Sequence, residues 1–160
     1  MKALKLKEYK FHQPCLNLNI EFTIQTMEEI LELAFTKDRC EQGGFLIGRY
    51  SDESSAIIEG TISPKRKNST PVSYIRFTDG MQDFWNRLYD ESGLIYLGEW
   101  HSHPGASANY STIDRDTMIE ISEADSVKIN YPLFLIIGLN KENPQIKFYT
   151  VYDKTIYEYE

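Results

Sequence analysis

Apolar residues recur every three or four positions between residues 27 and 37, which is the spacing of one face of an α-helix. Thr26 comes directly before this run, and threonine is a residue type that caps helix N-termini. We therefore expect a helix over 27–37 with Thr26 as its cap. The apolar positions are Met27, Ile30, Leu31, Ala34 and Phe35.

Other segments are shorter and rich in β-branched and aromatic residues, which is typical of strands. We expect the first two of them to pair as neighbours, and the fourth to run directly into His101 as a buried strand. Alternation along that strand places Trp100 on the face opposite His101, in the core. The segments are 45–50, 56–62, 74–77, 94–100, 132–139 and 145–152.

Two further helices are predicted, at 78–89 and 111–122. The second opens on Ser111-Thr112-Ile113-Asp114, a Ser-x-x-acid pattern that caps helices. Helices and strands thus alternate along the chain without an internal repeat. This order favours an α/β fold, with a central mixed sheet and helices packed on its faces. A length of 160 residues predicts one domain over 1–160.

The composition is that of an ordinary globular protein, with 41% hydrophobic and 13% aromatic residues. No apolar stretch is long enough to cross a bilayer, and the basic N-terminus lacks the apolar region and cleavage site of a secretion signal. We therefore expect a soluble, cytoplasmic protein without a membrane partner.

The net charge of −7 repels a phosphate backbone, and the one basic cluster is Lys65-Arg66-Lys67, in an expected loop. Nucleic acid is therefore not an expected partner. Cys15 and Cys40 form no CxxC pair and no multi-cysteine framework, so we expect no disulfide. Cys40 is expected to be a small packed residue.

The strongest chemical signal is His101-Ser102-His103-Pro104 with Asp114 a short distance downstream. Residues i and i+2 of a strand point to the same face, so both imidazoles and a nearby carboxylate can form three sides of a tetrahedral metal site. Three protein ligands leave the fourth position open to water, which is the arrangement of a catalytic rather than a structural zinc. The pattern therefore favours a hydrolase.

Each of these residues also has a plainer interpretation. A His-x-His pair on a strand is more often not a metal site, and Ser111 with Asp114 can simply cap a helix. Glu41, taken alone, is typical of a solvated residue that follows a helix. Capping and catalysis are compatible, because a first-turn placement can direct both side chains toward the strand that carries the histidines.

The complete order of polar residues resembles the signature of the JAMM or MPN+ metalloproteases. Glu41 is followed by His101-x-His103-Pro104 and, after six residues, by Ser111-x-x-Asp114. The surrounding segments 43–48 and 98–104 look most like the small prokaryotic JAB-domain branch, and the resemblance spans about residues 20 to 150.

This resemblance implies a zinc-dependent isopeptidase with a cytidine-deaminase-like fold. It makes His101, His103 and Asp114 the zinc ligands, Glu41 the general base and Ser111 the donor that stabilises the oxyanion. The chemistry agrees, because zinc lowers the pKa of its water to about 7 and a nearby carboxylate can then accept the proton. The tetrahedral oxyanion needs one further donor, which a hydroxyl can supply.

The resemblance also implies the substrate class. Small members of the family act on ubiquitin-like or sulfur-carrier proteins and cut after a C-terminal Gly-Gly tail, in deconjugation or in precursor processing. Some bacterial members belong to anti-phage conjugation systems. An extended tail without side chains can be gripped through its main chain at a sheet edge. The segment Pro64 to Tyr74 is a hypothetical contact for that tail, and an ordinary surface loop is the alternative.

Other functions are weighed by what the sequence contains. A cytidine deaminase needs His-x-Glu followed by Pro-Cys-x-x-Cys, and both patterns are absent, as are His-Glu-x-x-His and a phosphate-binding loop. A catalytically silent scaffold of the same family would lack the ligand residues that this chain keeps. A DNA-repair-associated role is disfavoured by the acidic charge.

Overall fold

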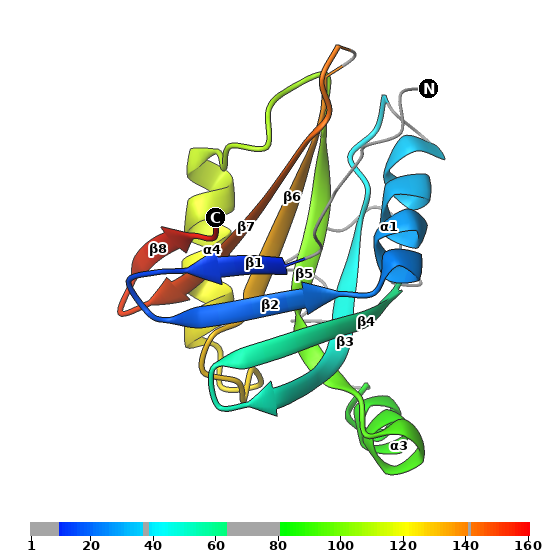
Figure 1. Cartoon of the computed structure of the whole chain (residues 1–160), viewed down its shortest axis with the longest axis vertical. Coiled ribbons are helices and arrows are strands. Elements are labelled where there is room, and N and C mark those ends of the chain that lie inside the picture. The colour runs from blue at the N-terminus through cyan, green and yellow to red at the C-terminus, as the bar shows by residue number, and fades with distance from the viewer. Residues whose placement is uncertain (1–9, 37–38, 64–80, 141) are drawn as a thin grey trace.

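The computed structural model describes residues 10–36, 39–63, 81–140 and 142–160. Its strands form one mixed sheet of eight strands, in the order β1-β2-β4-β3-β5-β6-β7-β8 (Figure 1). The elements are β1 (Lys10–Gln13), β2 (Leu18–Phe22), α1 (Ile24–Thr36), β3 (Gly43–Asp52), β4 (Ser55–Ile62), α3 (Gln82–Ser92), β5 (Ile95–Pro104), α4 (Thr112–Glu123), β6 (Leu133–Leu139), β7 (Gln145–Tyr152) and β8 (Thr155–Glu158).

Parallel pairing occurs at β2–β4 and β5–β6, and the other neighbouring strands are antiparallel. The predicted mixed sheet with flanking helices is therefore confirmed, as is the expected pairing of the first two predicted strands, which are β3 and β4. The sheet also curls far enough for its two ends to meet. The amide of His12 donates to the carbonyl of Glu160 at 2.9 Å, and the amide of Glu160 donates back at 2.7 Å.

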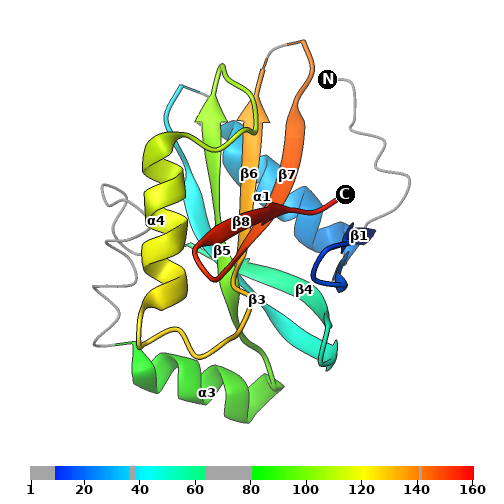
Figure 2. The same ribbon diagram turned by 90° about the vertical axis from the view of Figure 1, so that its left-hand side faces the viewer.

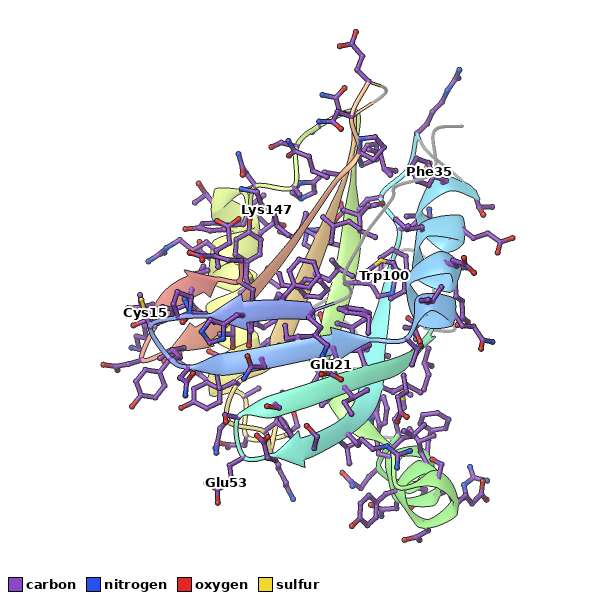
Figure 3. The ribbon with its side chains drawn as sticks, in the orientation of Figure 1. Cys15, Glu21, Phe35, Glu53, Trp100 and Lys147 are labelled. Atoms are coloured by element: carbon purple, nitrogen blue, oxygen red, sulfur yellow. The ribbon has the colours of Figure 1, made fainter. Side chains whose placement is uncertain are left out.

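The two faces of the sheet are covered by different helices, α1 on one face and α4 on the other (Figure 2). Strand β6 is apolar throughout because it contributes to both cores. Leu135 packs in the core beneath α1, whereas Ile136 packs in the core beneath α4. Trp100 on β5 is 1% exposed and points toward α1, so its predicted place in the core is confirmed (Figure 3).

Helix α1 begins earlier than the apolar spacing indicates. The hydroxyl of Thr23, not that of Thr26, accepts a hydrogen bond from the N-terminal turn, namely from the amide of Thr26 at 3.2 Å. The predicted cap was therefore wrong, because the helix has an exposed first turn with Ile24 and Gln25 before its buried face begins. Thr26 lies inside the helix and is buried.

Helix α3 corresponds to the helix predicted at 78–89, but it continues to Ser92. Gly93 ends it with φ of 72°, a conformation that glycine adopts without steric cost, and its amide donates to the carbonyl of Tyr89 at 2.7 Å. The strand predicted at 74–77 and the segment Pro64 to Tyr74 lie outside the described residues. Among the helices that are described, none has the length and apolarity needed to cross a bilayer.

Candidate active site

Strand β5 brings the two histidines to the face of the sheet that α4 covers. Because side chains alternate along a strand, His101 and His103 share this face while Trp100 packs toward α1. His101 is 9% exposed, so its imidazole is held among packed atoms and not on a mobile surface. The alternation that the sequence predicted therefore directs both imidazoles toward the helix that carries Asp114.

The N-terminus of α4 fixes the third member of the group. The hydroxyl of Ser111 accepts the amide hydrogen of Asp114 at 3.0 Å, and the Asp114 carboxylate accepts the amide hydrogen of Ser111 at 2.8 Å. This reciprocal capping box confirms the predicted cap. It also sets the Asp114 side chain in the first turn of the helix, next to the histidines.

The ligand atoms of His101, His103 and Asp114 converge on one point. The Nε2 atoms of the two histidines lie 3.1 Å apart. Oδ1 of Asp114 is 3.1 Å from Nε2 of His101, and Oδ2 is 2.9 Å from Nε2 of His103. Zinc bonds of about 2.0 Å in a tetrahedron place ligand atoms roughly 3.3 Å apart, so the spacing fits a small divalent cation.

The hydrogen bond on the far side of His103 determines which nitrogen faces this point. Nδ1 of His103 lies 3.0 Å from the carbonyl oxygen of Ser107. A carbonyl can only accept, so Nδ1 carries the hydrogen and Nε2 of the neutral ring presents a lone pair toward Asp114. Lone pairs that face one another require a shared cation, either a proton or a metal ion. The donor set is thus suited to zinc.

The electrostatics follow from the same contacts. The hydrogen bond to Asp114 raises the pKa of His103, although burial acts in the opposite direction, and the charge of Glu41 contributes to the increase. Burial alone would raise the pKa of Asp114, but hydrogen bonds from both histidines override it and hold that pKa far below its ordinary value. Asp114 is therefore ionised at any physiological pH.

Glu41 reaches the site from the other side, just before β3. The amide of Ser102 donates to the carbonyl of Gln42, and the amide of Gln42 donates to the hydroxyl of Ser102, both at 2.9 Å. These bonds hold the segment containing Glu41 beside the two histidines. Cys40 is exposed, so its prediction as a packed residue was wrong. It precedes the first residue of β3 by three positions and lies in a bend instead of in the core.

All five residues singled out in the sequence line one pocket of about 430 Å³. Its walls are polar near the histidines and apolar farther in, where α4 packs over β6. Ile113, on the first turn of α4, is 76% exposed and lies at its rim. The lining residues are Glu41, Glu99, His101, His103, Pro104, Ala106, Ser111, Ile113, Asp114, Thr117, Met118, Ile121 and Phe134.

Glu99 is a pocket residue that the sequence interpretation missed. It is 3% exposed, and neither of its carboxylate oxygens has a hydrogen-bond partner among the residues that the structure describes. Burial raises its pKa well above the ordinary value, and the nearby Tyr96 hydroxyl is also buried and has no hydrogen-bond partner within the described ranges. The available signal was its position two residues before His101, on the same strand face.

Comparison with known proteins shows what this chain is similar to. A relative from Enterobacter hormaechei subsp. hoffmannii, named CD-NTase/cGAS isopeptidase, is 28% identical over 137 residues, or 84% of this chain and 76% of the relative. The solution structure of a protein from Desulfitobacterium hafniense is 24% identical with a TM-score of 0.59, covering 87% of this chain and 88% of that one. A JAB1/MPN domain protein from Archaeoglobus fulgidus is 18% identical with a TM-score of 0.45, covering 78% and 79% of the two chains.

The family model described as prokaryotic homologs of the JAB domain matches residues 23–152. This segment contains the elements from α1 to β7, including both helices that cover the sheet, and every residue that lines the candidate site. The match covers most of the chain, and it confirms the resemblance read from the order of polar residues. The chain belongs to the family of prokaryotic JAB-domain proteins.

Proposed function

We propose that this protein is a zinc-dependent isopeptidase that cleaves after the Gly-Gly tail of a ubiquitin-like or sulfur-carrier protein. The observation that carries the proposal is the convergence of two imidazole nitrogens and a carboxylate oxygen at 2.9 to 3.1 Å, inside a pocket that also contains a carboxylate and a hydroxyl. Family membership and an isopeptidase among the relatives support a hydrolase.

In this proposal His101, His103 and Asp114 hold the metal ion. When bound, zinc supplies a Lewis acid that polarises the scissile carbonyl and makes water acidic enough to lose a proton near neutral pH. The hydrogen bond from His103 to Ser107 keeps one imidazole in the orientation and tautomer that binding requires. The capping box does the same for the Asp114 carboxylate.

Glu41 is the general base. Its carboxylate lines the pocket opposite the helix that carries Asp114, and its charge influences His103. A carboxylate in this place accepts a proton from the attacking water and can return it to the departing amine, which leaves as a neutral group. Glu41 therefore lies on a different segment of the chain from the proposed metal ligands, so a substitution of Glu41 leaves those ligands in place.

Ser111 stabilises the negative charge that develops on the carbonyl oxygen. Its oxygen already accepts the amide hydrogen of Asp114, so the hydroxyl hydrogen remains available for donation into the pocket. A donor held by a helix cap is oriented before the reaction begins, which is what makes such donors effective.

The proposed substrate class rests on the type of bond that would be cleaved and on the name of one relative. An isopeptide bond joins a C-terminal carboxyl group to a lysine side chain, and a tail of two glycines brings no side chains to the buried metal-binding group. The Enterobacter relative is named for CD-NTase/cGAS, so we extend the proposal to conjugates of such an enzyme, in a bacterial anti-phage system.

The test uses a Gly-Gly-tailed ubiquitin-like protein joined through an isopeptide bond to a lysine-containing reporter peptide. Zinc-loaded wild type should release the reporter, and Glu41→Gln should keep its zinc but cleave roughly 10² to 10⁴ times more slowly. Glu53→Gln, which changes an exposed turn residue, is the matched control and should cleave normally. The same carrier in a linear fusion distinguishes isopeptide from peptide cleavage. Intact conjugate after incubation with the zinc-loaded wild type would reject the proposal, and conjugate bound but uncut would indicate a scaffold.

A further inference from the structure

Ser102, the residue between the two histidines, is fully buried, and alternation along β5 places its side chain on the sheet face opposite theirs. Its hydroxyl oxygen accepts the amide hydrogen of Gln42 at 2.9 Å, while its own amide donates to the carbonyl of Gln42 at the same distance. Two hydrogen bonds therefore join Ser102 to the residue that follows Glu41.

This pairing differs from a regular antiparallel ladder. Gly43 is paired with His101 at the end of the β3–β5 ladder, so Gln42 and Ser102 are the next two residues to meet. In a regular ladder a hydrogen-bonded pair exchanges both amide hydrogens between main-chain carbonyls. Here the side-chain hydroxyl takes the place of one carbonyl, and β3 begins only at Gly43.

The hydrogen bond acts on Glu41 through one peptide group. The amide hydrogen that Ser102 accepts belongs to the planar peptide that joins Glu41 to Gln42. This hydrogen bond therefore fixes the orientation of that peptide plane, and with it the main chain that carries the Glu41 side chain. Within the described part of the chain, the Glu41 carboxylate itself makes no hydrogen bond that would orient it. Its direction into the pocket therefore depends on its main chain.

We propose that Ser102 is a positioning residue, whose buried hydroxyl holds the Glu41–Gln42 peptide so that the Glu41 carboxylate faces the metal-binding group. This inference rests on the proposed function of Glu41 as the general base. A displacement of about 1 Å in a catalytic group can reduce a rate by as much as 10²-fold. Loss of the hydroxyl should thus lower kcat and leave KM and zinc content unchanged.

The first experiment measures amide hydrogen exchange and requires no activity. In zinc-loaded Ser102→Ala, the Gln42 amide should exchange at least tenfold faster than in the wild type, whereas the amide of Leu46, farther along β3, should not change. Unchanged exchange at Gln42 would overturn the proposal. This outcome is independent of whether the protein proves to be an isopeptidase.

The second experiment is a double-mutant cycle on the reporter conjugate. Ser102→Ala should reduce kcat by one to two orders of magnitude in the wild-type background but have no further effect in Glu41→Gln, because the residue it positions is already disabled. An equal loss in both backgrounds, or a loss of bound zinc, would show that Ser102 acts through the histidines and would refute the inference. Thr150→Val removes another fully buried hydroxyl, one that donates to the carbonyl of Pro132, and should leave kcat unchanged.

Discussion

Gly138 on β6 lies against the main chain of Ser107, so closely that a Cβ atom on the glycine would stand 2.5 Å from the Ser107 carbonyl carbon. The oxygen of that carbonyl accepts the hydrogen of His103 Nδ1. A strand that contributes no metal-binding side chain therefore supports the orientation of one of the histidines, because only glycine leaves room for the loop at this point.

Replacing Gly138 with alanine should weaken zinc binding. The added methyl group displaces the Ser107 carbonyl, and disruption of such a supporting hydrogen bond typically costs 10- to 100-fold in metal affinity. Competition with a fluorescent zinc chelator measures the change. Gly60→Ala is the matched control, because its Cβ would meet only the Ile47 side chain, at 3.3 Å. Equal zinc affinity in the two variants would contradict the role of Gly138.

Replacing His103 with alanine should abolish both zinc binding and cleavage, since two remaining ligands hold a zinc ion poorly. Elemental analysis of the purified protein gives the zinc content per chain. His12→Ala is the control, because His12 is exposed and pairs with Asn19 on the neighbouring strand. If His103→Ala retained a full equivalent of zinc, the proposed ligand set would be incorrect.

Substitutions at Ser111 should separate its two roles. Ser111→Ala loses both the cap and the donor, so we expect kcat to fall on the order of 10²-fold and stability to fall by about 1 kcal/mol, with zinc retained. Ser111→Asp preserves a capping oxygen without a hydroxyl hydrogen, and should keep the stability but not the activity. Urea unfolding and steady-state kinetics test this pair. An active Ser111→Asp protein would remove the hydroxyl from the mechanism.

Replacing Glu99 with glutamine should change the pH dependence of stability. Burial raises the pKa of Glu99, so above the ordinary glutamate pKa the native state keeps a proton that the unfolded chain releases. Unfolding is then favoured as pH rises, by up to about 1.4 kcal/mol per pH unit until the native pKa is reached. Glutamine does not titrate, so the variant should become more stable relative to the wild type between pH 5 and 7.

The measurement is urea unfolding of metal-free wild type and metal-free Glu99→Gln at several pH values. All other titratable groups then contribute equally to the free energy of unfolding of the two proteins. Glu53→Gln serves as the control, since Glu53 is exposed in the turn between β3 and β4. Parallel stability curves for wild type and Glu99→Gln would show that the Glu99 carboxyl is not held in its protonated form.

The elements predicted from the sequence were those with long apolar patterns, and the errors have physical causes. Strands β1 and β8 have four residues each, so each is too short to carry a clear alternating pattern in the sequence. Strand β2 has a clear alternation, with Leu18, Ile20 and Phe22 buried, and its omission was avoidable.

The candidate site was more predictable than the fold because its chemistry is local. Strand alternation and a helix cap are sufficient to bring His101, His103 and Asp114 together. The supporting residues were not predictable in this way. The contacts of Gly138 with Ser107 and of Ser102 with Gln42 join segments that are distant in sequence, so only the folded chain reveals them.

The two histidines and Asp114 come from one strand and the helix that follows it, and Asp114 lies 13 positions after His101. An ion that joins residues so close in sequence reduces the conformational entropy of the unfolded chain only modestly, whereas an ion that joins distant parts of a polypeptide reduces it more. Neither hydrophobic core includes His101, His103 or Asp114. We therefore expect the fold to persist when the ion is removed, so that activity can be lost and regained without unfolding of the protein.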